Sequence, residues 1–196
     1  MALTSSDSIT PTCNINQDRI QGLIEHICFL SIGALALYFS EERIFADAGY
    51  YLFRVINAKW FWVEHNRFIL AIPETFPLIG VWLGLGTASI IKVFSLGHVM
   101  YFYIIYLITR YVLKDRSTGI QLLLLQTLGI ASGFFVPVFE LYYGAGLLVL
   151  FSSLLVQQPF RGRILLMAAL LFMILTSHQY TYPLFFFVIA SHLLAD

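Results

Sequence analysis

The chain has 196 residues, of which 59% are hydrophobic and only 11% are charged. A soluble domain carries roughly 45–50% apolar and about 25% charged residues, so this composition excludes an ordinary soluble domain and indicates a polytopic membrane protein. Basic and acidic residues number 11 each, which removes any whole-chain attraction to nucleic acid, and 16% aromatic content excludes a disordered chain. We therefore expect no nucleic-acid partner.

Apolar stretches divide the chain into a polar tail and one membrane domain. Residues 1–21 contain no obvious signal peptide and are expected to form a polar cytosolic tail, whereas residues 22–196 form a single transmembrane domain. A helix that crosses a membrane needs about 20 mostly apolar residues. We predict an all-α, polytopic transmembrane helical bundle with about six spans: Gly22–Phe39, Ala88–Leu113, Thr118–Phe139, Tyr142–Val156, Ile164–Ser177 and Tyr182–Ala195.

One further apolar stretch, Phe68–Gly86, is left out of this count because of charge placement. Two short basic connections, Lys114–Ser117 and Gln157–Arg163, are separated by two spans and so lie on one side, which the positive-inside rule makes the cytoplasm. Ala88–Leu113 then runs inward, and Phe68–Gly86 cannot cross as well. Two prolines and Glu74 also disfavour a spanning helix there. The alternative is a kinked span with the N-terminus outside.

The outer loop of residues 40–87 holds most of the polar chemistry, and part of it is predicted to form an amphipathic helix along the membrane surface. An apolar stripe repeats there at helical spacing: Phe45, Gly49, Leu52, Phe53 and Ile56. Four other residues share a second face at i, i+3, i+4 and i+7: Asp47, Tyr50, Tyr51 and Arg54. Asp47 lies in the first turn, where the helix dipole favours a carboxylate. A purely structural N-terminal carboxylate is the alternative reading.

Other polar residues are expected on the same side of the membrane. Glu64, His65 and Arg67 follow four aromatic or apolar residues and have the chemistry to bind a phosphate or a sugar, although a solvated turn would have the same composition. Glu140 and His178 fall at predicted outer turns between spans. The predicted topology places both of them on the same side as Asp47.

These motifs resemble the start of glycosyltransferases of the GT-C type, which are polytopic enzymes that use lipid-phosphate-linked sugars. Asp47–Tyr51, with its D-x-x-Y-Y pattern, is similar to the first juxtamembrane helix in the first outer loop of that family. His65–Gly80 is similar to the second such helix, and Ser177–Pro183 resembles the outer polar kink between two spans. The resemblance covers residues 22–195 as an architecture, with short motifs.

The resemblance implies that a sugar moves from a polyprenyl-phosphate donor to an acceptor on the outer face. Asp47 would act as the general base on the acceptor hydroxyl, and Arg54 and Arg67 would bind the anionic leaving phosphate. The expected substrate-binding residues are Tyr50, Tyr51, Arg54, Glu64, His65, Arg67, Glu140 and His178.

The same resemblance implies a place in the cell and a set of partners. We expect an integral protein of a bacterial plasma membrane with its active face outside the cytoplasm, which contacts membrane lipid and a polyprenyl-phosphate sugar. The resemblance does not identify a cofactor. A divalent metal occurs in some members, and four residues have suitable ligand atoms, although no spacing demands a metal: Glu64, His65, Glu140 and His178.

Two departures from the family pattern leave alternatives open. Asp47 stands alone where the family usually has an acidic pair, and the chain has fewer spans than most members. A non-catalytic fragment, or an assembly subunit that binds a lipid-linked glycan or partner subunits, is therefore one alternative. A small transporter that uses Glu25, Lys92 and His98 is another, which the sparse polar residues within the spans disfavour. For His98 we expect a hydrogen bond inside the bundle.

Overall fold

A computed structural model describes residues 15–128, 134–137 and 140–195, and every regular element in these residues is helical. The predicted all-α class is confirmed for this part of the chain. The elements are α1 (Ile15–Tyr38), α2 (Asp47–Ala58), a 3₁₀ turn (Phe68–Leu70), α3 (Ala71–Trp82), α4 (Thr87–Leu107), a π-helical turn (Ile108–Val112), α5 (Arg116–Leu128), α6 (Glu140–Val156), α7 (Arg163–Leu175) and α8 (Thr181–Ala195).

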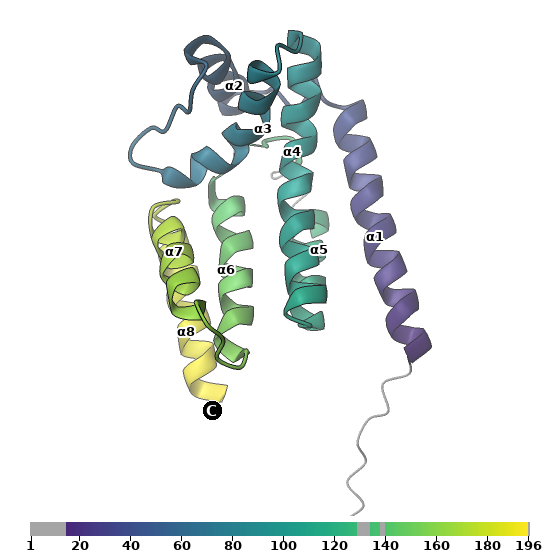
Figure 1. The fold of residues 1–196 in the computed structure, drawn as a ribbon, viewed down its shortest axis with the longest axis vertical. Helices are drawn as coiled ribbons and strands as arrows, with labels where there is room; N and C mark the ends of the chain where they lie inside the picture. The colour runs from purple at the N-terminus through teal and green to yellow at the C-terminus, as the bar shows by residue number, and fades with distance from the viewer. Residues whose placement is uncertain (1–14, 129–133, 138–139, 196) are drawn as a thin grey trace, which may run out of the picture.

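Six helices run along the long axis of the molecule, and the other two lie across one end (Figure 1). The six are α1, α4, α5, α6, α7 and α8, and the two that cover the top of the view are α2 and α3. We call this the α2–α3 end. The connections from α4 to α5 and from α6 to α7, which contain the two short basic segments, lie at the opposite end. This arrangement agrees with the interpretation of residues 40–87 as a loop gathered on one side.

The core is built around α4, which packs against α1, α3, α5 and α6. Large side chains from these helices meet there with almost no exposed surface, among them Phe102, Tyr106, Leu122 and Tyr143. His98 of α4 is buried and forms a hydrogen bond of 3.0 Å with the hydroxyl of Tyr143. The expectation that His98 bonds within the bundle is therefore confirmed.

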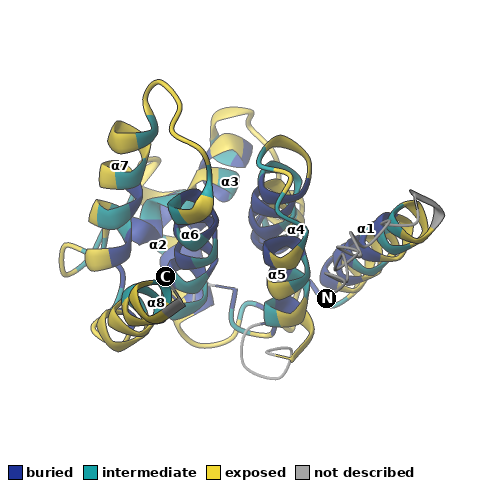
Figure 2. Ribbon diagram, turned by 90° about the horizontal axis from the view of Figure 1, so that it is seen from below, coloured by how far each residue is buried: buried dark blue, intermediate teal, exposed yellow. Residues whose placement is uncertain are grey.

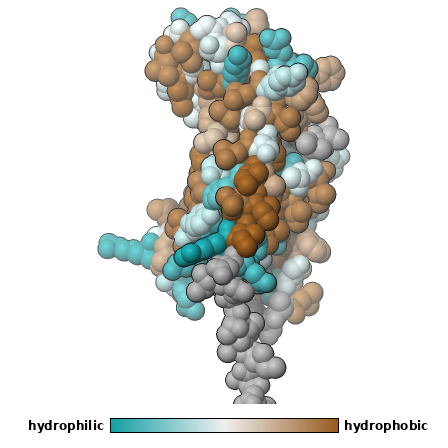
Figure 3. Space-filling view, turned by 90° about the vertical axis from the view of Figure 1, so that its right-hand side faces the viewer, coloured by the Kyte–Doolittle hydropathy of each residue, from teal (hydrophilic) through white to brown (hydrophobic). Residues whose placement is uncertain are grey.

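The outward surface of the bundle is unusually apolar. Figure 2 shows that buried residues face the interior of the bundle, whereas the outer faces of α7 and α8 are exposed. Many exposed side chains are large and hydrophobic, and Ile164, Phe187 and Leu194 are 85%, 70% and 88% exposed. Figure 3 shows hydrophobic side chains over much of the middle of the face that carries α1. Burying such a surface in lipid removes it from water, which is the favourable direction.

Among the described residues, two helices are long and apolar enough to cross a membrane, Gln17–Tyr38 and Thr87–Val112. Four apolar helical segments are shorter: Phe68–Trp82, Glu140–Val156, Arg163–Leu175 and Thr181–Leu194. Residues 129–133 and 138–139 of the predicted span at residues 118–139, and residues 1–14 of the predicted tail at residues 1–21, lie outside the described residues. The first helix begins at Ile15, seven residues before the predicted first span.

A buried arginine fixes the connection between α1 and α2. The side chain of Arg43 is fully buried, and its Nε donates to the carbonyl oxygen of Phe134 at 2.7 Å. Its Nη1 donates to the carbonyl oxygen and the hydroxyl of Ser95, at 3.0 and 2.9 Å. The guanidinium also lies over the Phe134 ring, 4.3 Å from its centre. These contacts set the point from which α2 starts.

Candidate functional site

Asp47 is the first residue of α2, and a tight turn leads into it. A Cβ atom on Gly49 would lie 2.8 Å from the carbonyl oxygen of Ile44, so this close approach requires a glycine. Ala46, just before the helix, has a positive φ of 52°. The D-A-G sequence therefore marks a tight turn into α2. Asp47, the first residue of the helix, is exposed there.

The buried face of α2 differs from the predicted one. Four residues at helical spacing are buried: Ala48, Tyr51, Leu52 and Val55. They pack against side chains of α4 and the 3₁₀ turn, such as Phe94 and Leu70. Of the predicted stripe only Leu52 is buried, and Phe45 and Phe53 lie on the surface. Tyr51 therefore faces the interior, whereas the expectation placed it on one face with Asp47.

Tyr50 and Arg54 form a cluster with the segment after α2. The hydroxyl of Tyr50 and the indole Nε1 of Trp62 both donate to Oε1 of Glu64, at 2.6 and 2.7 Å. These two hydrogen bonds hold the pKa of Glu64 below its usual value. The guanidinium of Arg54 lies over the rings of Tyr50 and Trp62, at 5.0 and 4.6 Å. Stacking uses the faces of the guanidinium and leaves its N–H edges available, so the phosphate-binding role of Arg54 stays a prediction.

Trp62 links this cluster to a buried carboxyl group that the sequence analysis did not select. Its backbone N–H donates to Oε2 of Glu74 at 2.7 Å, while Oε1 of Glu74 is buried without a hydrogen-bond partner. Burial raises the pKa of Glu74 to about 7, against the opposing effect of the Trp62 hydrogen bond. The only sequence signal was an acidic residue inside an apolar stretch, which had been used to argue against a span.

Arg67 joins the outer loop to the bundle. Its Nη1 donates to Oε1 of Glu140, the first residue of α6, at 2.7 Å. The Glu140 side chain is 10% exposed and that of Arg67 is 36% exposed, so the guanidinium remains open to solvent on one side. His65 and Asn66, just before it, both have positive φ, which bends the chain sharply at this point.

A cavity of about 540 Å³ lies beside this ion pair. It is lined by His65, Asn66, Arg67, Leu175, Thr176, Ser177, His178, Gln179 and Tyr182. The lining comes from the bend after α2 and from the turn between α7 and α8, which are more than 100 residues apart in the chain. The predicted polar kink at residues 177–183 is therefore a turn that meets the outer loop, with predicted site residues on both sides. A volume of this size is in the range of small-ligand sites.

A glycine in α6 allows the turn to reach this position. A Cβ atom on Gly144 would lie 2.7 Å from Oγ of Ser177 and 2.8 Å from Cγ2 of Thr181. The turn is also held internally, since the Ser177 hydroxyl donates to the carbonyl oxygen of Ile174 at 2.6 Å. Close packing of α6 against the turn therefore places His178 near the first turn of α6, where Glu140 lies.

Tyr51 is a buried tyrosine on the inner face of α2. Its pKa is raised to about 12, first by burial and then by the negative charges of Glu140, Glu64 and Asp47, against the opposing charge of Arg67. Among the predicted site residues, the structure joins Arg67 to Glu140 by an ion pair and Glu64 to Tyr50 by a hydrogen bond. It places His65 and His178 with Arg67 at the cavity.

Asp47 itself is exposed and forms no hydrogen bond or ion pair with another described residue. In the part of the chain that the structure describes, no group of three His, Cys, Asp or Glu side chains could hold a metal ion. Of the four residues considered as metal ligands, Glu64 is hydrogen-bonded to Tyr50 and Trp62 and Glu140 is paired with Arg67, whereas His65 and His178 line the cavity. The arrangement offers an exposed carboxylate and a cavity lined by one arginine and two histidines at one end of the bundle.

No protein-family model, no curated protein and no solved structure matches this chain. The functional assignment therefore depends on the geometry of the site.

Proposed function

We propose that the bundle is embedded in a bacterial plasma membrane, with α1, α4, α5, α6, α7 and α8 as its six spans and the α2–α3 end on the outer face. The support is the apolar outer surface of the bundle and the placement of both short basic connections at the opposite end. Helices shorter than about 20 residues require a locally thinned bilayer or flanking residues at the interface. Exposed aromatic residues at the α2–α3 end, such as Phe45, Phe53 and Trp60, suit an interfacial belt.

We further propose that the protein is a GT-C-like glycosyltransferase that takes its sugar from a polyprenyl phosphate. The observation that supports this most is the cavity at the α2–α3 end, where Arg67, His65 and His178 meet and where Arg67 is paired with Glu140. Arginine and histidine side chains suit a phosphate group, and carboxylates and tyrosines suit sugar hydroxyls. The donor would reach this position from the membrane, since its lipid tail stays in the bilayer.

The proposed reaction needs one base and one site for an anion. The acceptor hydroxyl attacks the anomeric carbon, and its proton passes to the carboxylate of Asp47. The bond between the anomeric carbon and the phosphate oxygen breaks, and the electron pair leaves with the lipid phosphate. Arg67 would stabilise that phosphate with the face of its guanidinium that Glu140 does not occupy. Arg54 would instead shape the site by stacking on Tyr50 and Trp62.

Turnover by purified protein in lipid nanodiscs tests this proposal. The assay offers polyprenyl-phosphate sugars and a hydroxyl acceptor to the wild type, to Asp47→Asn and to a control, Glu42→Gln. Glu42 is an exposed carboxylate in the same loop, outside the proposed site. We expect Asp47→Asn to lose turnover by a factor of roughly 10²–10⁴ while donor binding persists, and Glu42→Gln to retain activity.

Other outcomes contradict the proposal in distinct ways. Binding without turnover in all three proteins would indicate a non-catalytic module or an assembly subunit, and would leave the donor-binding part intact. Equal turnover in Asp47→Asn and the wild type would remove Asp47 as the base. No binding in any of them would overturn the glycosyltransferase proposal as a whole.

A further inference from the structure

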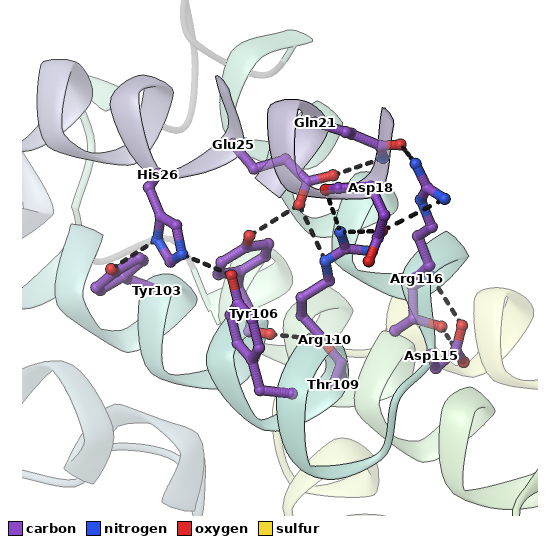
Figure 4. A network of polar contacts seen from close by, with 12 residues as sticks. Asp18, Gln21, Glu25, His26, Tyr103, Tyr106, Thr109, Arg110, Asp115 and Arg116 are labelled. Carbon is purple, nitrogen blue, oxygen red and sulfur yellow. Dashed lines mark hydrogen bonds and ion pairs between the residues drawn. The ribbon is translucent and has the colours of Figure 1, made fainter. Parts of the chain in front are cut away.

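A second polar site lies at the end of the bundle opposite α2 and α3. There α1 meets the π-helical turn and the start of α5 (Figure 4). Arg110 has a side chain only 6% exposed, and its Nη2 donates to Oδ1 of Asp18 at 2.6 Å. Its Nε lies 3.4 Å from Oε2 of Glu25, and Nη1 of Arg116 lies 3.3 Å from Oδ1 of Asp18. These ion pairs join segments about 90 residues apart in the chain.

Tyrosine and histidine side chains hold this end of α1 in place. The two ring nitrogens of His26 form hydrogen bonds with the hydroxyls of Tyr103 and Tyr111, at 2.9 and 2.7 Å. The hydroxyl of Tyr106 donates to Oε2 of Glu25 at 2.8 Å. These contacts bind two adjacent residues of α1 to α4 and the π-helical turn that follows it, and so they hold this part of α1 against them. The cationic groups beside it are therefore held in a defined arrangement.

The connection after the π-helical turn brings two more cations to the same place. Lys114 has a positive φ of 56°, which turns the chain into α5. Asp115 caps that helix, since its carboxylate accepts hydrogen bonds from the backbone N–H and the hydroxyl of Thr118. Lys114 and Arg116, on either side of the cap, consequently flank Arg110.

These residues enclose a pocket of about 630 Å³. Its lining is Asp18, Arg19, Gly22, Leu23, His26, Arg110, Tyr111, Lys114 and Arg116. Four of the lining side chains are cations and one is a carboxylate, and the neighbouring Glu25 is already paired with Arg110. The pocket thus keeps an excess of positive charge after its internal ion pairs are formed. Such an excess in a concave site attracts anions.

Apolar side chains continue from the pocket along the same helix. Leu23 lines it, and Ile20, Ile24 and Ile27 are exposed on α1 nearby, each by more than half of its surface. A ligand with an anionic head and a hydrocarbon tail fits this combination better than a free anion does, because its head can contact the cations while its tail contacts the apolar side chains.

We propose that this pocket binds the phosphate headgroup of an anionic phospholipid in the leaflet at this end of the bundle. Basic pockets between transmembrane helices are a physical means of holding such headgroups, because each cation near the surface gains about 1 kcal/mol from the anionic lipid. The proposal does not require glycosyltransferase activity, and it depends only on the bundle being in a membrane. A bound lipid would brace α1 against α4 and α5.

Binding of short-chain phosphatidylglycerol to the full chain in detergent tests the proposal, with short-chain phosphatidylcholine as the neutral probe. The test variant is Arg19→Gln/Lys114→Asn, which removes two exposed cations and leaves the ion pairs of Arg110 intact. Asparagine tolerates the positive φ at position 114. We expect the wild type to prefer the anionic lipid, and the variant to bind it about thirtyfold more weakly.

The control variant is Arg161→Gln/Lys59→Asn. It removes one exposed arginine and one lysine with positive φ, both away from the pocket, so the change in net charge and backbone preference is the same. It is expected to bind phosphatidylglycerol as the wild type does. Equal weakening in both variants, or equal binding of the two lipids by the wild type, would overturn the proposal.

Two further measurements on the wild type keep the test independent of the variants. Added sodium chloride should weaken binding of phosphatidylglycerol and leave binding of phosphatidylcholine unchanged, because salt screens exposed charges. Inorganic phosphate should bind more weakly than the lipid. Binding of phosphate as tight as that of the lipid would show that the pocket takes a soluble anion and would reject the lipid assignment, as would binding that salt does not affect.

Discussion

Arg67 and Glu140 are 73 residues apart in the chain and form an ion pair of 2.7 Å at the α2–α3 end. The pair joins the outer loop to the first turn of α6, next to the turn that carries His178. It also leaves part of the Arg67 guanidinium exposed toward the cavity. One contact therefore both fixes the shape of the proposed site and orients its main cation.

A double-mutant cycle with Arg67→Gln and Glu140→Gln should reveal this coupling. Because Arg67 is partly exposed, we expect a coupling free energy of about 1 kcal/mol rather than the larger value of a fully buried pair. Denaturant unfolding in detergent measures it. A cycle that pairs Glu140→Gln with Arg161→Gln, which removes an exposed arginine on another loop, should show no coupling. Zero coupling in the first cycle would contradict the structure.

The pKa of about 7 for Glu74 predicts an unusual pH dependence of stability. In the unfolded chain this carboxyl has a pKa of 4.5. At pH values between 4.5 and about 7, the folded state therefore binds the proton more tightly than the unfolded state does. Stability should therefore fall as pH rises from about 5 to about 7 and level off above, by as much as ~3 kcal/mol. Glu74→Gln should remove this fall and be more stable than the wild type at about pH 8. Thermal unfolding across this pH range checks both statements.

Glu64→Gln is the matched control for Glu74→Gln. The pKa of Glu64 is lowered by its hydrogen bonds, so the sign is reversed: the contribution is present above the unfolded pKa and disappears only as pH falls through the lowered value. The Glu64→Gln variant should therefore keep most of the wild-type fall in stability between about pH 5 and pH 7, since burial is the main cause of the raised pKa of Glu74 and the charge of Glu64 a smaller one. Identical pH profiles for Glu74→Gln and the wild type would show that Glu74 does not carry the effect.

Gly144→Ala should disturb the turn that carries His178. The new methyl group would lie within 3 Å of Ser177 and Thr181, so the turn must move away from α6. We expect a loss of about 1–3 kcal/mol in the free energy of unfolding, together with weaker donor binding. Gly33→Ala in α1 is the control. Its new methyl group would lie 3.6 Å from Leu96, which is an ordinary van der Waals contact. The control should be neutral or slightly stabilising, and equal effects of the two substitutions would refute the packing argument.

Arg43→Ala should be strongly destabilising. The substitution leaves the carbonyl oxygens of Phe134 and Ser95 without the donor that they have in the structure, and it empties a fully buried volume. A loss of roughly 3–5 kcal/mol is expected from these two effects together. Urea or guanidinium unfolding in detergent gives the value, with the exposed Arg161→Ala as reference. A loss below about 1 kcal/mol would show that the α1–α2 connection does not depend on Arg43.

Local patterns in the sequence predicted a good part of this architecture. Composition indicated an all-α bundle, charge placement put residues 40–87 on one side, and the D-A-G-Y-Y motif marked the start of α2 at Asp47. The polar segment at residues 177–183 was expected at a turn, and the structure has its turn there. These features depend on local conformational preferences and on the average polarity of segments, and both can be estimated from neighbouring residues in the sequence.

The tertiary structure decided what each side chain contacts. Helical spacing placed Tyr51 with Asp47, but in the structure Tyr51 joins a buried cluster with residues of α4 and the 3₁₀ turn, and Phe45 and Phe53 lie outside. Periodicity identifies faces of a helix without saying which partner covers each one.

The same limit applies to the ionisable residues. Arg110 and Asp18 are 92 residues apart, and no spacing in the chain predicts that they pair. The burial of Glu74 and the stacking of Arg54 on Trp62 likewise required the positions of separate segments. Composition and periodicity therefore determined the helices by local energetics, whereas the two polar sites arose from long-range packing, which only the folded chain specifies.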